Sequence, residues 1–229
     1  MKPPSKVPAS WATNLAVPVG WMRQFRYLSN RFDEIADIDG DIVECGLGEG
    51  NTFSMLAYLV GSENRGRKGA RKLWGFDSFQ GFPQPSRWDE SPRKPLKGEW
   101  RVTQALIHKR LSDSGIKRGF PQLDIRITKG FLAQSLPNFP KRRIALLHLD
   151  VDLYEGYRDG LSYLFPKMAV GGLVLFDEYR EFHPRDPAYG KKEKWPGCSR
   201  VVDEYFANRP EKPIYDAEAK KYFVVKIGR

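Results

Sequence analysis

Apolar residues are distributed along this chain in two alternating patterns. Short apolar runs, which predict buried β-strands, cover residues 42–45, 73–76, 144–149, 173–176 and 222–227, and alternating apolar and polar residues predict a further strand over 123–128. Between them, apolar residues at steps of three and four predict helices over residues 53–60, 102–111, 155–165 and 201–206. Strands that alternate with helices are typical of an α/β fold with a mostly parallel sheet. We therefore expect one such domain over residues 41–229.

The first 40 residues follow a different pattern. Residues 1–18 contain four prolines and no sustained period, which indicates an extended arm. Apolar residues at positions 22, 25, 28, 32 and 35 then form one stripe of a helix, which ends near Gly40. Two interpretations of this helix stay open: it packs on the core of the domain, or it forms a lid or an oligomer contact over the active site.

A glycine-rich turn follows the first predicted strand. Glycines occupy every second position of residues 46–50, and a helical pattern comes next. Strand, glycine turn and helix open a nucleotide-binding βα unit, because glycines let a ligand approach the backbone closely. The acid at the strand end would repel a pyrophosphate but suits a cationic ammonium group, such as that of S-adenosylmethionine. A tight turn without a ligand is the alternative. The candidate cofactor residues here are Glu44, Gly46, Gly48, Gly50, Asn51 and Thr52.

Two further strand ends carry candidate cofactor residues. Asp77 ends the second strand, where an acid accepts hydrogen bonds from ribose hydroxyls, and Ser78 begins the loop that borders the adenosine. Gly130 and Phe131 follow the third strand, where an adenine ring would stack on the aromatic side chain. Phe131 has an equally simple interpretation as a core residue.

Four carboxylates follow the fourth and fifth strands. Asp150 and Asp152 are two positions apart, so both side chains point the same way on an extended chain. Asp177 comes 27 residues after Asp150, which is the interval between the ends of adjacent parallel strands. With Glu178, these acids form an all-oxygen cluster of the kind that Mg²⁺ prefers. One of Asp150 and Asp152 can then hold a metal ion while the other reaches the proton of a substrate; structural ion pairs are the alternative.

Composition narrows the functional classes only slightly. The net charge of +10 favours an acidic partner weakly, because the basic residues are dispersed in short clusters. The two cysteines, Cys45 and Cys198, are too few for a disulfide framework or a cysteine metal site. The N-terminus lacks the apolar segment of a secretory signal, and no run has the length of a membrane span, so a cytoplasmic protein is expected.

Six motifs, in this order, resemble those of the macrocin O-methyltransferase (TylF-like) family. They are VECG at residues 43–46, FDSFQGFP at 76–83, LDVDLYE at 149–155, PK at 166–167 with GG at 171–172, FDEY at 176–179 and PGCSRVVDE at 196–204. The resemblance runs from about residue 40 to the C-terminus. It implies a Rossmann-like class I methyltransferase fold, with seven mostly parallel strands, helices on both faces and a last antiparallel strand.

The resemblance also implies an activity. It indicates Mg²⁺-dependent transfer of a methyl group from S-adenosylmethionine to a hydroxyl of a sugar or glycosylated small molecule. The metal acids of the family fall on Asp150, Asp177 and Glu178, its base falls on Asp152, and Asp150 also borders the cofactor. Glu178 departs from the aspartate that is usual in the family. The basic loops at residues 85–100 and 180–196 also match the family poorly. The resemblance therefore indicates the type of reaction more firmly than the identity of the substrate.

Other interpretations remain open at this point. The acceptor is a hydroxylated small molecule in the first hypothesis, and a phenolic natural product or a nucleic acid in the second. The sequence has no amino-methylating Asn/Asp-Pro-Pro-Tyr motif, so no nucleic acid is expected as a partner. No membrane partner is expected either, because no apolar run has the length of a membrane span. A non-catalytic nucleotide-binding domain is the third hypothesis, and it has no need of three acids at one sheet edge. Homo-oligomerisation is left open.

Overall fold

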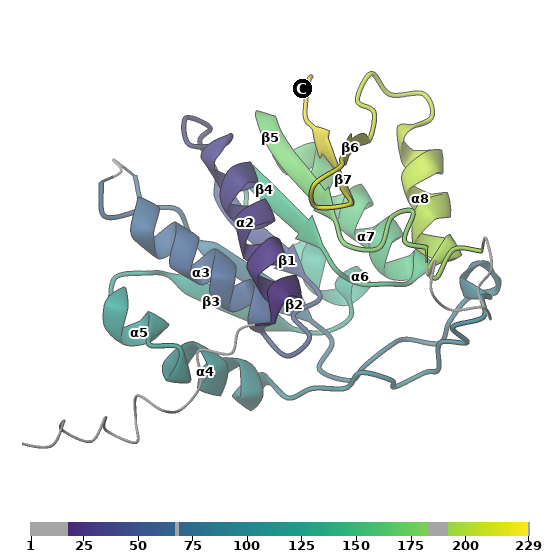
Figure 1. Ribbon diagram of the computed structural model, residues 1–229, viewed down its shortest axis with the longest axis horizontal. Coiled ribbons are helices and arrows are strands. Elements are labelled where there is room, and N and C mark those ends of the chain that lie inside the picture. Colours follow the sequence, from purple (N-terminus) through teal and green to yellow (C-terminus); the bar gives the residue numbers. More distant parts are fainter. Residues whose placement is uncertain (1–17, 67–68, 183–191, 229) are drawn as a thin grey trace, which may run out of the picture.

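A seven-stranded sheet forms the centre of the molecule (Figure 1). The computed structural model describes residues 18–66, 69–182 and 192–228. The strand order is β3-β2-β1-β4-β5-β7-β6, and β7 runs antiparallel to both neighbours while the other pairs run parallel. The strands are β1 (Asp41–Cys45), β2 (Leu73–Asp77), β3 (Ile125–Lys129), β4 (Ile144–Leu149), β5 (Met168–Phe176), β6 (Ile214–Asp216) and β7 (Lys221–Val225). This topology confirms the predicted mostly parallel sheet with an antiparallel last strand.

Helices cover both faces of the sheet. One face carries α2 (Val19–Asp33), α3 (Asn51–Glu63), α4 (Gln104–Asp113) and α5 (Ile116–Gly119). The other carries α6 (Leu132–Ser135), α7 (Tyr154–Leu164) and α8 (Pro196–Phe206). Short 3-10 turns are η1 (Arg87–Asp89), η2 (Leu136–Asn138) and η3 (Phe165–Lys167). The helix over residues 155–165 was expected to stop at Pro166, and α7 does end directly before the turn that contains it.

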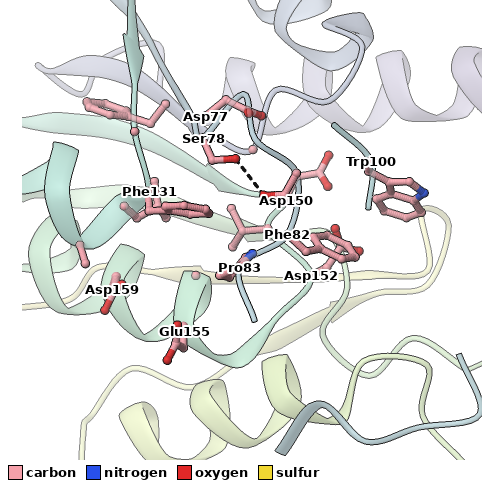
Figure 2. A pocket seen from close by; sticks show the side chains of 18 of the residues that line it. Asp77, Ser78, Phe82, Pro83, Trp100, Phe131, Asp150, Asp152, Glu155 and Asp159 are labelled. Carbon is pink, nitrogen blue, oxygen red and sulfur yellow. Dashed lines mark hydrogen bonds between the residues drawn. The ribbon is translucent and has the colours of Figure 1, made fainter. Parts of the chain in front are cut away.

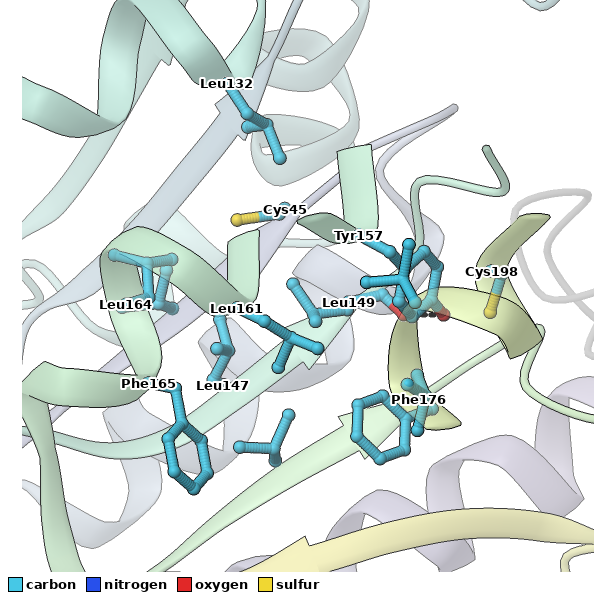
Figure 3. Packing of buried hydrophobic residues seen from close by; sticks show 14 of the residues in the cluster. Cys45, Leu132, Leu147, Leu149, Tyr157, Leu161, Leu164, Phe165, Phe176 and Cys198 are labelled. Atoms are coloured by element: carbon cyan, nitrogen blue, oxygen red, sulfur yellow. Dashed lines mark hydrogen bonds between the residues drawn. The ribbon is translucent and has the colours of Figure 1, made fainter. Parts of the chain in front are cut away.

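Each face of the sheet has its own hydrophobic cluster. Alternate residues of a strand point to opposite faces, so in β1 Ile42 packs toward α2 and α3, whereas Val43 packs toward α7. Figure 3 shows the second cluster, in which Tyr157 and Leu161 of α7 lie beside Leu149 of β4. Because β1 and β4 are buried on both faces, their ends are held rigidly, which positions the loops that follow them.

The structure corrects one predicted strand boundary. The apolar run at residues 173–176 predicts a strand that begins only after the glycine pair Gly171–Gly172. Instead β5 begins at Met168 and runs through both glycines, and its register against β4 shifts along the way. Gly171 has a φ of +82°, and a Cβ on Gly172 would lie 2.9 Å from the carbonyl oxygen of Ala145. The two glycines therefore form a bulge within a continuous strand.

The N-terminal helix packs on the domain. Tyr27, Leu28 and Phe32 of α2 are buried in the cluster that α3 also joins. The predicted arm over residues 1–17 lies outside the described residues, so the division at residue 40 stays a prediction. Among the helices that are described, none combines the length and apolar character needed to cross a bilayer.

A buried arginine ties the loop after α2 to the sheet and to α3. The guanidinium of Arg71 donates to the carbonyl oxygens of Ile35 and Gly40, each at 2.7 Å, and of Ile38 at 2.6 Å. It also pairs with Glu63 of α3 at 2.7 Å, and only 2% of Arg71 is exposed. A buried cation is tolerated here because its donors have partners.

Candidate active site

The carboxyl ends of β1, β4 and β5 meet at one edge of the sheet. The backbone amide of Asp150 donates to the carbonyl of Cys45 at 2.9 Å, and that of Asp177 donates to the carbonyl of Leu149 at 3.0 Å. These bonds continue the sheet one residue past its strands. Asp150 and Asp177 therefore lie side by side, as the 27-residue interval predicts.

A cavity of about 310 Å³ opens at this edge (Figure 2). Eight of the residues predicted from the sequence line it: Gly46, Gly48, Asp77, Ser78, Gly130, Phe131, Asp150 and Asp152. The remaining predicted residues, which are Glu44, Gly50, Asn51, Thr52, Asp177 and Glu178, lie outside the lining. The structure thus brings together residues from the ends of four strands around one volume.

The glycine turn is held against the neighbouring strand ends. A Cβ on Gly46, whose φ is +83°, would lie 1.6 Å from the carbonyl oxygen of Asp150, so only glycine fits there. Gly48 has no atom within 4 Å of a built Cβ, and it lines the cavity. Asp77 accepts the amide of Leu47 at 2.8 Å and the amide of Phe79 at 2.7 Å, one on each carboxylate oxygen. Asp77 therefore fixes the turn in addition to facing the cavity.

Glu44 lies beneath the turn and is fully buried. Its Oε1 is 2.9 Å from Nδ1 of His148, and the Nε2 of His148 is 4.0 Å from Asp177. Burial raises the pKa of Glu44 to about 7, although the hydrogen bond to His148 opposes this. Burial alone would lower the pKa of His148, but the hydrogen bond to Glu44 reverses the direction and raises it. The predicted contact between Glu44 and a methionine ammonium group stays a prediction.

Asp150, Asp177 and Glu178 bring three carboxylate oxygens within 4.8 Å of one another. Asp177 is also held by Lys221 of β7, whose Nζ lies 2.7 Å from its Oδ1. Glu178 lies two residues past the end of β5 at Phe176, and because the chain has left strand geometry there, its side chain turns toward Asp150. All of the donors are hard oxygen atoms, so the cluster fits Mg²⁺ and lacks the nitrogen or sulfur ligands of a typical zinc site.

Mutual repulsion and burial dominate the electrostatics of this cluster. Burial, with the charge of Asp177, raises the pKa of Asp150 to about 6. Burial and the charges of Asp152 and Asp150 raise the pKa of Glu178 well above its usual value. Burial would also raise the pKa of Asp177, but the ammonium of Lys221 outweighs it and lowers that pKa. A bound cation would relieve the repulsion among the three carboxylates.

Asp152 lines the cavity from a constrained turn. Its φ is +58°, in the left-handed region, so the extended geometry assumed from the sequence is absent. Its backbone amide donates to Oε2 of Glu178 at 3.3 Å. Burial and the charge of Asp150 raise the pKa of Asp152 well above its usual value. The raised proton affinity and the place of Asp152 in the cavity wall are both compatible with exchange of a proton with a bound molecule.

Several lining residues were missed by reasoning from the sequence. They include Glu99, Trp100, Glu155 and Asp159, whereas Phe82 and Pro83 belong to the loop after Asp77 that was expected to border the adenosine. Glu155 and Asp159 lie four residues apart on α7, a spacing that places both on one helix face. Trp100 belongs to a loop without periodicity, where an exposed aromatic residue among polar ones was the available signal.

The fold and the site together define the class of this protein. A glycine turn after β1, an acid at the end of β2 and a cavity at the carboxyl edge of a 3-2-1-4-5-7-6 sheet characterise a class I methyltransferase. The solved structure of the O-methyltransferase NovP has the same fold, with a TM-score of 0.72 and 21% identity over 90% of this chain and 81% of that one.

The macrocin O-methyltransferase (TylF) family profile matches residues 16–205, so the chain belongs to this family. Family membership confirms the predicted class of S-adenosylmethionine-dependent O-methyltransferase. A demethyldecarbamoylnovobiocin O-methyltransferase of Streptomyces niveus is 27% identical over 86% of this chain and 70% of its own length. An 8-demethyl-8-(2,3-dimethoxy-alpha-L-rhamnosyl)-tetracenomycin-C 4'-O-methyltransferase of Streptomyces olivaceus is 26% identical over 73% of this chain and 63% of its own length. The chain thus spans less than three-quarters of either relative.

Proposed function

We propose that this protein transfers the methyl group of S-adenosylmethionine to a hydroxyl of a sugar on a glycosylated small molecule, with Mg²⁺ as its metal ion. The observation that carries the proposal is the carboxylate cluster of Asp150, Asp177 and Glu178 beside Asp152 at the wall of one cavity. The relatives support the acceptor class, since one of them is named for a tetracenomycin that bears a rhamnosyl group.

The residues at the cavity wall suit S-adenosylmethionine. Gly46 and Gly48 expose bare backbone to the cavity, which a ligand can approach without meeting side chains. Asp77 uses one lone pair of each oxygen for a backbone amide, and a carboxylate has about four acceptor positions, so it retains capacity for ribose hydroxyls. Phe131 presents an aromatic ring to the same cavity, where an adenine base would stack.

Asp150, Asp177 and Glu178 would hold the metal ion. The donor set fits, because the three oxygens converge and each of the carboxylates is buried or half-buried. When bound, Mg²⁺ lowers the pKa of a hydroxyl oxygen that it ligates. Lys221 holds Asp177 in its ionised form, which keeps one anionic ligand available over the whole neutral range.

Asp152 is the proposed base. It lines the cavity together with Asp150, so a hydroxyl held near the metal acids also lies near Asp152. Asp152 takes the proton of the acceptor hydroxyl as that oxygen bonds to the methyl carbon and the carbon–sulfur bond breaks. Since a sulfonium methyl group is already activated, the main task of the protein is to align the reacting atoms.

The proposal is tested with labelled S-adenosylmethionine and a panel of acceptors. The panel contains phenyl α-L-rhamnopyranoside, phenyl β-D-glucopyranoside, a catechol and a total RNA preparation, each with Mg²⁺ and with EDTA. Label on a glycoside, lost with EDTA and restored by Mg²⁺, is the expected result. Label that appears on the catechol or the RNA and on no glycoside would assign a different acceptor, and activity that EDTA leaves unchanged would remove the metal assignment.

A further inference from the structure

Three aromatic rings form a corner at the edge of the cavity. The ring centroids of Phe82 and Trp100 are 5.4 Å apart, and each of them is 5.9 Å from the centroid of Trp195. Phe82 and Trp195 are buried, at 8% and 2% exposure, whereas 54% of Trp100 is exposed. Trp100 is therefore packed on one side and open on the other, and it lines the cavity.

The backbone around Trp100 is fixed in an uncommon conformation. Its φ is +57°, in the left-handed region that costs a residue with a side chain of order 1 kcal/mol or more. Two backbone hydrogen bonds of 2.9 Å hold it there, from Phe82 to the carbonyl of Glu99 and from Gly98 to the carbonyl of Phe82. A Cβ on Gly81 would lie 2.4 Å from the carbonyl oxygen of Glu99, so this close approach requires glycine. The loop backbone therefore fixes the direction in which the indole of Trp100 points.

Arg93 clamps the same corner. Its guanidinium lies 5.2 Å from the ring centroids of both Trp100 and Trp195, within the range of a cation–π interaction. The same group makes two hydrogen bonds to the carboxylate of Glu99, the residue before Trp100. Arg93 thus joins the backbone position of the loop to the orientation of its exposed indole.

The loop that carries Trp100 is joined to the turn of the proposed base. Oδ1 of Asp89 accepts the backbone amide of Tyr154, two residues after Asp152, at 2.8 Å. In Figure 2, Phe131 and Trp100 lie on opposite sides of the view, with Asp150 between them. Since Phe131 is the proposed adenine contact, Trp100 faces the part of the cavity that remains for the acceptor.

The negative charge of the cavity wall favours an uncharged part of the acceptor. Six carboxylates line it: Asp77, Glu99, Asp150, Asp152, Glu155 and Asp159. Among its described lining residues, Arg158 supplies the single cationic side chain, and it already pairs with Asp159 at 2.9 Å. An anionic group would be repelled by this wall, whereas an uncharged ring with one apolar C–H face packs on an indole and keeps its hydroxyls toward the carboxylates.

We propose that Trp100 is the specificity-determining platform for the acceptor, on which the uncharged pyranose ring stacks, and that Arg93 is its positioning residue. This inference rests on the proposed function. The indole face orients the ring so that one hydroxyl reaches Asp152, and binding energy for the sugar comes from the stacked C–H face.

The test is a kinetic comparison with phenyl α-L-rhamnopyranoside and phenyl β-D-glucopyranoside as acceptors. Trp100→Ala is expected to raise KM for the better glycoside at least tenfold, with a smaller change in kcat and a Kd for S-adenosylmethionine within twofold. Trp100→Phe, which keeps an aromatic face, is expected to raise KM about threefold. Tyr215→Ala removes another exposed aromatic residue, at 51% exposure on the edge strand β6, and is the control that leaves KM unchanged.

The role of Arg93 is tested by a measurement that a general loss of structure would not reproduce, which is the coupling between its substitution and that of Trp100. Arg93→Ala is expected to raise KM, and the double variant with Trp100→Ala to raise it no further, because both changes remove one platform. A wild-type protein that labels no glycoside overturns the proposed function and the platform with it. If wild type labels a glycoside, an unchanged KM in both Trp100 variants, or a Kd for S-adenosylmethionine that rises in parallel with KM, overturns the platform alone.

Discussion

The hydroxyl of Tyr157 lies 2.6 Å from Oε2 of Glu178, and so connects α7 to the end of β5. The same hydroxyl is 3.0 Å from the carbonyl oxygen of Leu149, and one proton cannot serve both acceptors. A protonated Glu178 would donate to Tyr157 and leave the hydroxyl free for Leu149, which agrees with the raised pKa of Glu178. Oε2 of Glu178 also accepts the amide of Asp152. One carboxylate oxygen of the proposed metal cluster therefore contacts both Tyr157 and the turn of Asp152, the proposed base.

Removing this hydroxyl is expected to destabilise the protein. Tyr157→Phe removes the shortest hydrogen bond of the buried Glu178 side chain, which costs roughly 1–3 kcal/mol of unfolding free energy. Urea unfolding of the metal-free protein measures the loss. Tyr163→Phe, on the exposed side of the same helix at 39% exposure, is the matched control and is expected to change little. Equal stability of the two variants would show that Tyr157 does not support Glu178.

Asp152→Asn is expected to separate binding from chemistry. Asparagine tolerates a positive φ, so the turn keeps its shape, while the side chain loses its proton affinity. We expect kcat to fall about 10²–10⁴-fold, with the Kd for S-adenosylmethionine and for Mg²⁺ within a factor of about three. Stopped assays and calorimetric titration give the two quantities. A variant that keeps full turnover would exclude Asp152 as the base.

The charge of Asp150 predicts a specific pH dependence. Its folded-state pKa, about 6, is above its usual value of 3.8, so the folded protein binds the proton more tightly than the unfolded chain. In the absence of metal, this group favours folding at low pH, and that contribution declines as pH rises from about 4 through 6. Asp150→Asn lacks this dependence. Wild type is therefore expected to lose stability relative to Asp150→Asn over that range, as chemical unfolding at each pH in EDTA would show; a relative gain would contradict the pKa direction.

Two glycines of the same turn are expected to respond differently to alanine. Gly46→Ala places a methyl group on the carbonyl of Asp150, so the strand end must move and folding is impaired. Gly48→Ala meets no neighbouring atom but projects into the cavity wall, at a φ of +47°. We expect Gly48→Ala to stay folded and to bind S-adenosylmethionine at least tenfold more weakly. Thermal unfolding and equilibrium binding distinguish the two, and tight binding by Gly48→Ala would argue against a cofactor at this turn.

Arg71 provides a test of the fold outside the site. Arg71→Ala removes the buried guanidinium that pairs with Glu63 and donates to the carbonyls of Ile38 and Gly40, and is expected to cost about 3–5 kcal/mol. Arg126→Ala removes an arginine that is exposed and pairs with Asp124 at the surface, and is expected to lower the unfolding free energy much less. Denaturant titration of both variants gives the comparison. Losses of similar size would mean that the network of Arg71 does not hold α2 on the domain.

The sequence predicted those parts of the site that depend on strand ends. Asp77, Asp150 and Asp177 each follow an apolar run, and parallel pairing alone brings such positions to one edge. The prediction grouped Asp152 with Asp150 by assuming an extended chain. The structure has a left-handed turn at Asp152 instead, and both side chains still line the cavity. Local periodicity does not encode a turn that tertiary hydrogen bonds impose.

The remaining features could not be predicted for related reasons. The three-residue strand β6 is too short for any period to be recognised, and its two exposed apolar residues resemble a loop. The orientation of Trp100 depends on Arg93, Glu99 and Trp195, which are brought together only by the fold. A single sequence contains these residues but not their contacts.

The antiparallel insertion of β7 has a consequence for the order in which the site matures. Asp150 and Asp177 belong to strands that precede β7, yet the ammonium that keeps Asp177 ionised is that of Lys221, the first residue of β7. A nascent chain that has formed β1 to β5 still lacks this counter-charge, and its carboxylates face one another unbalanced. The full charge balance of the proposed metal site is thus reached only when the last strand has paired with β5.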